Sequence, residues 1–547
     1  MRATGARPTN RPDLMSLWKS LAKVGSATIL SRVLGFIRDA MIAGSLGAGP
    51  ITDAFVVAFR LPNLFRRLFA EGVFNSAFVP LYAKILREEG EAGAARFAGE
   101  IASGLIGALV LFTGCAVILA PWLVDALAFG FAPDTRKFAL TVALTRICLP
   151  YLAAMSIIGL LGGILSAHRR YLAPAMAPVV LNLVLIGVLV AIDIAGYTRS
   201  VEAGYLLAIG VAVSGLCQVV MVGTAVWRGG HGFPLRAPAM TASIRRLMAT
   251  SVPAIVGGGI TQINIVIGTA IASLKAGTIS DLYYADRVYQ LPLGVIGIAI
   301  GVVLLPELLH RIRIDREDLA IDTQNRSLEM ALALTVPAAV GLIVAAHPII
   351  EVLFERGAFG PRDTDMTAFA LRAFAAGLPA FVMVKVLSAA LFARLDLKTP
   401  MWAGILAAIV NLALAIALFD RFGGAGIALA TSAAGWINAG ALWVVLSRRR
   451  LWRVDGPLEH RLPRLVAASL AMGVVVWVLR EVLDRWLGAE NALLIKVGAL
   501  AGLVGIGAGV YLGLGLLIGG IDLASIRAGL RAKQTSEDDP VAAVLAD

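Results

Sequence analysis

Charged side chains interrupt the apolar stretch 24–72, which is long enough for two membrane-spanning helices joined by a short Gly/Pro turn. Arg32 and Asp39 are seven positions apart, so on one helix they share a face and lie about 10 Å apart along the axis. Asp53 and Arg60 repeat that spacing on the next helix. A charge near the bilayer centre costs roughly 3 kcal/mol on insertion scales, so such residues normally face a wet cavity or a partner. The pattern therefore predicts a polar pocket within the membrane.

The charged helices 24–45, 52–82 and 281–309 hold more guanidinium groups than carboxylates, which favours binding of an anion. Arginine side chains bind phosphate oxygens with two hydrogen bonds at once and stay charged at every relevant pH. An exporter of cationic drugs would instead be expected to carry unpaired carboxylates and aromatic residues. The basic residues are Arg32, Arg38, Arg60, Arg66, Arg67 and Arg287, and the acidic residues are Asp39, Asp53, Glu71 and Asp286.

A structural role is the alternative for several of these residues. Arg60 could pair with Asp53, or its side chain could extend to the membrane interface. The segment after Pro62 that begins with Arg66 could be a solvated face. Further candidates for plain ion pairs are Arg67 with Glu71, four positions apart, and Asp286 with Arg287. Arg32 and Arg38 lie deeper in the predicted helix, so we expect them to serve function.

The composition indicates an integral membrane protein. The chain has 547 residues, of which 59% are hydrophobic and 15% charged, against about 25% charged in soluble domains. The net charge of +12 is best explained by basic cytoplasmic loops, so we expect no nucleic acid partner. The three cysteines stand alone in apolar segments and predict neither a disulfide framework nor a metal site.

Motifs for enzymatic chemistry do not stand out in the sequence. No GxxxxGK[ST] loop is present to bind a nucleotide, and neither HExxH nor a pair of catalytic carboxylates is evident. The five histidines fall at predicted loops or helix ends. We therefore expect a transporter rather than an enzyme, with no metal and no cofactor, driven by the membrane potential or an unidentified counter-ion.

About fourteen apolar runs have the length of a membrane span. They lie at 24–45, 52–82, 100–124, 138–166, 175–194, 203–227, 247–273, 281–309, 327–346, 366–392, 401–419, 425–447, 464–484 and 491–518. The loops after even-numbered runs hold 21 Lys and Arg residues against 9 in the opposite loops. By the positive-inside rule both termini are predicted to be cytoplasmic.

Landmarks recur at nearly one offset and suggest a duplicated unit of six helices. The pairs are Asp53 and Asp281 at an offset of 228, Pro150 and Pro379 at 229, Asn182 and Asn411 at 229, and Pro80 and Pro306 at 226. Because six is even, both copies would cross the membrane in the same sense, with a substrate site between them near the midplane. Chance matching of Leu-Pro pairs is the competing explanation.

This organisation divides the chain into six parts. They are a cytoplasmic tail (1–23), an N-lobe of helices one to six (24–227), a cytoplasmic linker (228–246), a C-lobe of helices seven to twelve (247–447), helices thirteen and fourteen (448–518) and a cytoplasmic tail (519–547). Helix fourteen carries glycines at three- and four-residue steps, which is typical of close helix packing and would also suit a groove for a lipid chain.

Four segments resemble the MurJ (MviN) lipid II flippases of the multidrug/oligosaccharidyl-lipid/polysaccharide exporter superfamily. They are SRVLGFIRDA (31–40), TDAFVVAFRLPNLFRRLFAEGVFNSAFVP (52–80), YYADRVYQLPLGVIGIAIG (283–301) and LKTP (397–400). The likeness extends over nearly the whole chain. It implies an all-α polytopic protein of the bacterial inner membrane, with two six-helix lobes in a V and two C-terminal helices that offer a groove for the lipid tail.

The resemblance also implies a substrate and site residues. The substrate would be lipid II, the undecaprenyl-pyrophosphate-linked peptidoglycan precursor, with membrane lipids and the cell-wall synthesis machinery as further partners. The cavity arginines of the family match Arg32, Arg38, Arg66 and Arg287, and its gate-associated charges match Asp39, Asp53 and Glu71. Some members bind sodium through acidic residues in helices seven and eleven, but 247–273 and 401–419 contain no Asp or Glu here.

The expected mechanism is alternating access, in which the four arginines hold the pyrophosphate while the isoprenoid tail stays in lipid. A potential of about 100 mV is worth roughly 2.3 kcal/mol per charge moved across, so an inside-negative membrane would drive an anion outward. The alternatives are an oligosaccharide-lipid flippase or drug exporter of the same superfamily, or a membrane scaffold that only recruits cell-wall enzymes. A membrane glycosyltransferase is less favoured because no large loop carries an acidic donor-sugar site.

Overall fold

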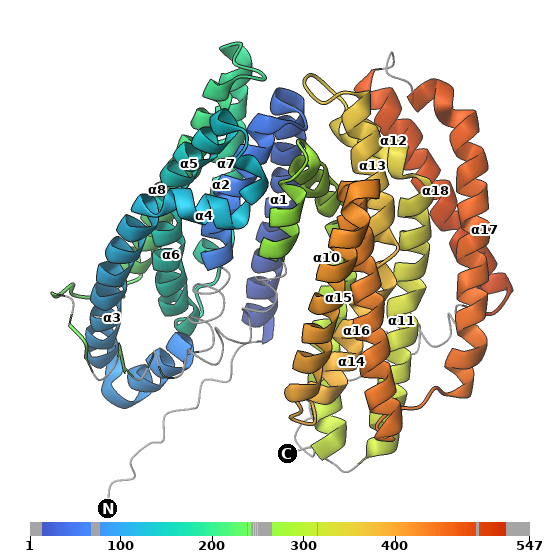
Figure 1. Cartoon of the computed structure of the whole chain (residues 1–547). Helices are drawn as coiled ribbons and strands as arrows, with labels where there is room; N and C mark the ends of the chain where they lie inside the picture. The colour runs from blue at the N-terminus through green and yellow to red at the C-terminus, as the bar shows by residue number, and fades with distance from the viewer. Residues whose placement is uncertain are drawn as a thin grey trace, which may run out of the picture. The chain divides into compact units, whose positions relative to one another are not determined.

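The computed structural model describes residues 14–66, 77–237, 239–241, 244–245, 247, 249, 265–313, 316–487 and 492–520 (Figure 1). Within these ranges seventeen α-helices and one short 3₁₀ helix, η2 (Phe129–Phe131), have defined bounds, and residues 265–272 are also helical. The predicted all-helical class is thereby confirmed.

Among the described residues, ten helices, or helix pairs joined end to end, are long and apolar enough to cross a membrane. They correspond to ten of the fourteen predicted spans. The other four predicted spans coincide with α1 (Leu14–Leu46), α2 (Pro50–Arg66) and α10 (Thr278–Arg313), and with 247–273, which lies mostly outside the described residues. The chain is a multi-pass membrane protein.

The chain divides into two compact units, and the first comprises Met1–Ser280 together with the loop Arg356–Phe359. In addition to α1 and α2, its helices are α3 (Val79–Ile118), α4 (Ala120–Leu127), α5 (Thr135–Cys148), α6 (Pro150–Ala167), α7 (Leu172–Ile194) and α8 (Val201–Arg228). Helix α7 packs against α1 and α8, while α6 packs against α3 and α8, and α2 against α5. These contacts bury the face of α1 that carries the charged residues after position 37.

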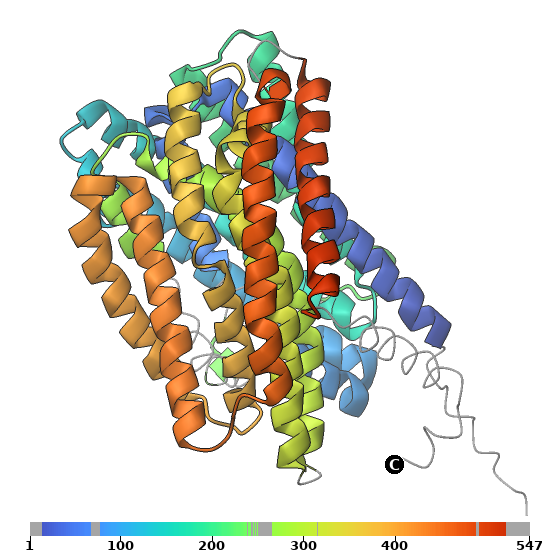
Figure 2. The ribbon, with the colours of Figure 1, turned by 90° about the vertical axis from the view of Figure 1, so that its right-hand side faces the viewer.

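The second unit comprises Asp281–Glu355 and Gly360–Asp547. After α10 its helices are α11 (Glu317–Val344), α12 (Ala346–Phe354), α13 (Pro361–Ala375), α14 (Leu378–Phe392), α15 (Lys398–Phe422), α16 (Gly424–Arg448), α17 (Gly456–Leu487) and α18 (Leu493–Leu517). Helix α15 packs against α16, and α11 packs against α14 and α17. The last two helices, α17 and α18, run side by side, as Figure 2 shows in orange-red and red.

The order of elements repeats along the chain. A long helix followed by a short one occurs as α3–α4 and again as α11–α12. A span broken by proline follows each time, because α6 begins at Pro150 and α14 has Pro379 in its first turn. Proline fits the first turn of a helix, where its missing N–H is not needed. Two unbroken helices then close each series, α7–α8 and α15–α16. This order supports the duplication inferred from the sequence.

The prediction of one helix over 52–82 followed by a loop is wrong in its boundaries. Residues 79–99 belong to α3, which continues to Ile118 across a kink at Gly90, where φ is 71° and ψ is −168°. The charged residues of this segment make it too polar to span a membrane, yet Ala, Leu, Glu and Arg favour a helix. Hydropathy alone therefore placed a loop where the chain forms an amphipathic helix.

The loop Arg356–Phe359 packs against the end of α1 within the first unit. The backbone N–H of Ala358 donates to the carbonyl of Gly44 at 2.7 Å. Gly47 adopts φ +70°, and a Cβ placed on it would lie 2.5 Å from the carbonyl oxygen of Ala358. The close approach of two backbones explains why glycine is required here.

We expect Gly47→Ala to lower the free energy of unfolding by about 1–3 kcal/mol, since the methyl group clashes with a backbone atom and the left-handed conformation disfavours a side chain. Thermal unfolding of the purified protein in detergent measures the effect. Gly49→Ala is the matched control, because nothing lies within 4 Å of its Cβ position. Equal stability of the two variants would contradict the packing described above.

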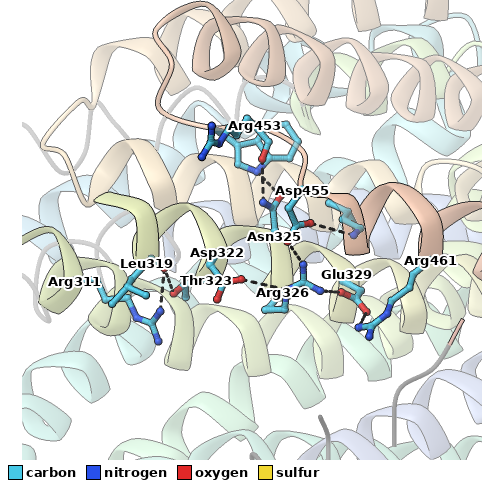
Figure 3. A network of polar contacts seen from close by, with 12 residues as sticks. Arg311, Leu319, Asp322, Thr323, Asn325, Arg326, Glu329, Arg453, Asp455 and Arg461 are labelled. Atoms are coloured by element: carbon cyan, nitrogen blue, oxygen red, sulfur yellow. Dashed lines mark hydrogen bonds and ion pairs between the residues drawn. The ribbon is translucent and has the colours of Figure 1, made fainter. Parts of the chain in front are cut away.

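A polar network joins α11 to the start of α17 (Figure 3). Arg326 pairs with Glu329 on its own helix and with Asp455 just before α17. Arg461 of α17 donates to the same Glu329 at 2.8 Å. The side-chain amide of Asn325 donates to the backbone carbonyl of Arg453 at 2.9 Å. These opposite charges satisfy one another, so we interpret the network as an attachment of α17 rather than a binding site.

The LKTP segment (397–400) forms the beginning of α15, and Asp396, directly before the segment, caps it. The side chain of Asp396 accepts from the backbone N–H of Thr399 at 3.0 Å and from its hydroxyl at 2.6 Å, which satisfies donors of the first turn. Arg449, just after α16, donates to the same carboxylate at 2.6 Å. Hydrogen bonds from Thr399, and next in importance Arg449, lower the pKa of Asp396 to about 2. The motif therefore has a structural explanation.

Candidate functional site

The predicted charged residues are distributed over α1, α2 and α10. Arg66 ends the described part of α2, but its side chain lies outside the described residues, as do Arg67 and Glu71. Those three predictions remain predictions. The remaining predicted residues are described, and all of them except Arg32 belong to one of three groups of contacts.

The first group is a buried cluster between α1 and α7. The guanidinium of Arg38 donates to Asp39 Oδ1 from Nε at 3.0 Å and from Nη2 at 2.7 Å, and to Asn182 Oδ1 from Nη1 at 2.9 Å. Asn182 in turn donates to the backbone carbonyl of Ser31 at 2.9 Å. Arg38 and Asp39 are 7% and 2% exposed, so this is an ion pair inside the unit. Arg38 is thus partly neutralised, which weakens its attraction for an anion.

Arg32 has a different environment one and a half turns earlier on α1. Its side chain is exposed, and among the residues that the structure describes it has no hydrogen-bond or ion-pair partner. An arginine in an apolar membrane helix carries a full charge that needs an anion or water. Arg32 therefore presents an exposed guanidinium on α1.

The second group centres on Asp53 in the first turn of α2. Its carboxylate accepts from Lys137 Nζ at 2.7 Å, from the backbone N–H groups of Gly277 at 2.8 Å and Ser280 at 3.0 Å, and from the Ser280 hydroxyl at 2.5 Å. Asp53 is fully buried, and Lys137 lies 3.9 Å from the centre of the Phe131 ring. One carboxylate thus connects α2, α5 and the N-terminal end of α10.

Lys137 was not among the predicted site residues. In the sequence it lies just before an apolar run, so it was interpreted as one of the nine basic residues in the loops of the less basic side. No spacing rule links it to Asp53, 84 positions earlier. The only signal was a lysine in the first turn of a helix, a position where acidic residues are favoured. Such a residue needs a nearby carboxylate, and the fold supplies one.

Arg60 lies two turns further along α2 and donates to the hydroxyl of Thr269. Thr269 is buried and also donates to the backbone carbonyl of Ile265 at 2.7 Å. The carboxylate of Asp53 binds Lys137 instead, so the suggested pairing of Arg60 with Asp53 is wrong. The physical reason is that α5 brings an ammonium group directly to the carboxylate.

The third group lies on α10, in the second unit. The guanidinium of Arg287 stacks over the ring of Tyr283, with its central carbon 4.6 Å from the ring centre, and Asp286 accepts from Gln290 one turn later. Asp281, the counterpart of Asp53 in the repeat, accepts from the Thr367 hydroxyl at 3.3 Å. A guanidinium over the face of an aromatic ring keeps its charge and is attracted by the ring.

These contacts divide the predicted charged residues into buried residues with protein partners and more accessible cations. Arg38, Asp39, Asp53 and Lys137 are buried and satisfied within their unit, which suits residues that hold helices in register. Arg32 is exposed and without a protein partner among the described residues, and Arg287 is half-buried over a tyrosine ring. The exposed guanidinium of Arg32 can bind an anionic group without first breaking a buried ion pair.

Comparison with known proteins identifies relatives over almost the entire chain. The family described as "Lipid II flippase MurJ" matches residues 42–498. A "Probable lipid II flippase MurJ" of Rhizobium meliloti is 45% identical over 519 residues, which cover 94% of this chain and 97% of the relative. A "Lipid II flippase MurJ" of Burkholderia cenocepacia is 31% identical over 509 residues, which cover 91% of this chain and 97% of that protein.

Solved structures share the fold. One described as "Lipid II flippase MurJ, inward closed conformation" matches with a TM-score of 0.72 at 24% identity, covering 90% of this chain and 98% of that one. An inward-facing multidrug resistance MATE transporter of the MOP superfamily matches with a TM-score of 0.63 at 15% identity, covering 79% and 98%. The arrangement of helices is thus the one shared by these transporters. Because the family match and the relatives extend over nearly the whole sequence, the chain belongs to the MurJ lipid II flippase family.

Proposed function

We propose that this protein moves lipid II from the cytoplasmic to the periplasmic leaflet of a bacterial inner membrane by alternating access, as a step of peptidoglycan biosynthesis. The observation that carries the proposal is the membership of the family, which extends over nearly the whole chain. Membership of a flippase family makes the chain a transporter rather than an enzyme.

The chemistry of the substrate fits the exposed cations. Lipid II carries a pyrophosphate, and guanidinium groups bind such oxygens through paired, charge-assisted hydrogen bonds. Arg32, Arg38, Arg66 and Arg287 are the proposed contacts. Arg32 is first in this order, because its guanidinium has no ion-pair partner among the described residues, whereas Arg38 already binds Asp39.

The buried charges have a supporting role in the proposal. Asp39 holds Arg38, and Asp53 connects three helices through Lys137 and Ser280. Asp39, Asp53, Arg60, Glu71 and Asp286 are therefore proposed as gate or cavity charges rather than as direct contacts to the pyrophosphate. Contacts of this kind can differ between the states that a transporter visits.

The orientation belongs to the same proposal. The excess of Lys and Arg in alternate loops supports cytoplasmic termini. An inside-negative potential of about 100 mV contributes roughly 2.3 kcal/mol per charge carried across, so outward movement of an anion would be favoured. Helices α17 and α18 are proposed to accommodate the lipid tail, since α18 carries exposed apolar side chains and glycines, among them Gly502 and Gly509, with open space at their Cβ positions.

The test combines growth and transport. The gene is expected to restore growth of a bacterium depleted of its own lipid II flippase. Vesicles that contain the purified protein are expected to expose labelled lipid II on the opposite leaflet, faster under an imposed potential of the favourable sign. Failure in both assays, with normal protein levels, would overturn the proposal. Transport of an oligosaccharide-lipid or a cationic drug without lipid II would support the other superfamily functions.

A further inference from the structure

Two histidines and a glutamate meet at one end of the first unit, outside the helices that carry the arginines discussed above. Glu91 follows the Gly90 kink of α3, His168 ends α6, and His231 lies in the segment after α8. One ligand atom from each residue can be chosen so that all three lie within 4.8 Å of one another. The sequence offered no metal-binding spacing here, because the two histidines are 63 positions apart.

The two imidazole rings are stacked, with centroids 3.5 Å apart and planes inclined by 15°. Nδ1 of His168 lies 3.8 Å from one carboxylate oxygen of Glu91, and Nδ1 of His231 lies 3.7 Å from the other. Both Nδ1 atoms are therefore close to the same carboxylate. The Nδ1 of His231 is buried and has no hydrogen-bond partner within the described part of the chain. A buried ring nitrogen without a partner is costly, and a bound cation would satisfy it.

Tyr82 can fix the position of the proton on His168, while the stacked rings must tilt apart for both Nδ1 lone pairs, which lie in the ring planes, to point at one ion. Its hydroxyl lies 3.2 Å from Nε2 of His168, and the tyrosine is buried within α3. When Nε2 carries the proton and donates to this hydroxyl, Nδ1 presents its lone pair toward Glu91 and His231. A hydrogen bond on the far nitrogen is the usual way in which proteins fix the tautomer of a metal-binding histidine.

The third member of the cluster, Glu91, lies at the surface. Glu91 is 65% exposed, so its side chain can move the short distance needed to complete the site.

We propose that His168, His231 and Glu91 bind one divalent transition-metal ion, with zinc as the best match, and that the ion connects the Gly90 kink of α3 to the ends of α6 and α8. Two imidazole nitrogens and one carboxylate are a donor set typical of zinc, whereas magnesium and calcium prefer oxygen ligands alone. Zinc ligands lie about 2.0–2.2 Å from the ion, so two nitrogens on one ion are at most about 4 Å apart. A water molecule would complete the tetrahedron.

The experiment uses the full-length protein in detergent, without a histidine tag and stripped of metal by a chelator. Titration calorimetry with zinc is expected to show one site per chain. His168→Gln, His231→Gln and Glu91→Gln are each expected to weaken zinc binding at least tenfold. Tyr82→Phe is expected to weaken it about 10- to 100-fold, as loss of an outer hydrogen bond typically does. Cobalt substitution is expected to give the intense visible absorption of a tetrahedral site.

Two matched variants serve as controls. His460→Gln removes a histidine from α17, in the other unit, and Glu88→Gln removes an exposed carboxylate from the same stretch of α3. Both are expected to bind zinc like the unsubstituted protein. Glu91 is exposed, so its variant keeps the test valid if a histidine variant fails to fold. The proposal is overturned if the protein binds no stoichiometric zinc, or if binding survives in both Glu91→Gln and His231→Gln. Because the readout is metal affinity, its outcome is independent of the flippase proposal.

Discussion

Replacing Arg32 by alanine is expected to reduce lipid II transport by about 10- to 150-fold. The basis is the loss of a charge-assisted hydrogen bond to phosphate, worth about 1.5–3 kcal/mol, from a guanidinium that binds no described protein group. Transport is measured as the leaflet accessibility of labelled lipid II in vesicles, and growth is measured in a flippase-depleted strain. The stability of the protein should change little, because Arg32 is exposed and makes no described contact that holds α1.

Arg32→Lys separates charge from geometry. Lysine keeps the positive charge but cannot make the paired hydrogen bonds of a guanidinium, so we expect intermediate transport. Arg228→Ala is the matched control, since Arg228 is also exposed, ends α8 and has no described partner. We expect that variant to transport normally. If Arg32→Ala transports as well as Arg228→Ala at equal protein levels, Arg32 does not contact the substrate.

Replacing Asp53 by asparagine is expected to lower the free energy of unfolding by about 3–5 kcal/mol. The variant keeps the shape of the side chain but leaves the ammonium of Lys137 buried without a counter-charge. Two backbone N–H groups, of Gly277 and Ser280, would also lose a charged acceptor. Thermal or denaturant unfolding in detergent measures the loss. We also expect weaker growth complementation, because this carboxylate joins α2 and α5 to Gly277 and Ser280 within the first unit.

A double-mutant cycle tests whether Lys137 is the partner of Asp53. Combining Asp53→Asn with Lys137→Met removes both charges, so we expect the pair to be more stable than Asp53→Asn alone. Asp193→Asn, at an exposed position of α7, is the control and should change stability by less than about 0.5 kcal/mol. A coupling energy near zero between Asp53 and Lys137 would mean that the ion pair does not hold these helices together.

Much of the fold could be predicted from the sequence because the bilayer sets a simple rule. A span needs about twenty apolar residues, and ten predicted spans reappear as helices or helix pairs of membrane length. The recurrence of Pro150 as Pro379 corresponds to breaks at the same place in the element order, α5–α6 and α13–α14. The helix boundaries were less predictable, as the start of α3 shows. A search for apolar runs does not detect a helical segment that carries many charged residues.

For the charged residues, too, one part was predictable from the sequence and another was not. The types of Arg32, Arg38, Asp39 and Asp53 were enough to predict a functional role for them, since an apolar helix seldom carries such groups without a function. Their partners were not evident. Asp39 neighbours Arg38 in sequence, but Asn182 is 144 positions away and Lys137 is 84 positions from Asp53. Contacts at such separations depend on which helices pack together.

By itself, the sequence determined the class of the protein and the chemistry available to it: apolar spans, basic loops and an excess of arginine over carboxylate in three helices. Only the tertiary structure decided which of those charges bind one another. It shows that Arg38 is held by Asp39 and Asn182, that Asp53 is held by Lys137 and Ser280, and that His168 and His231 lie beside Glu91. The physical reason is that hydropathy and helical period are local properties, whereas the pairing of buried polar groups depends on helices brought together from distant parts of the chain.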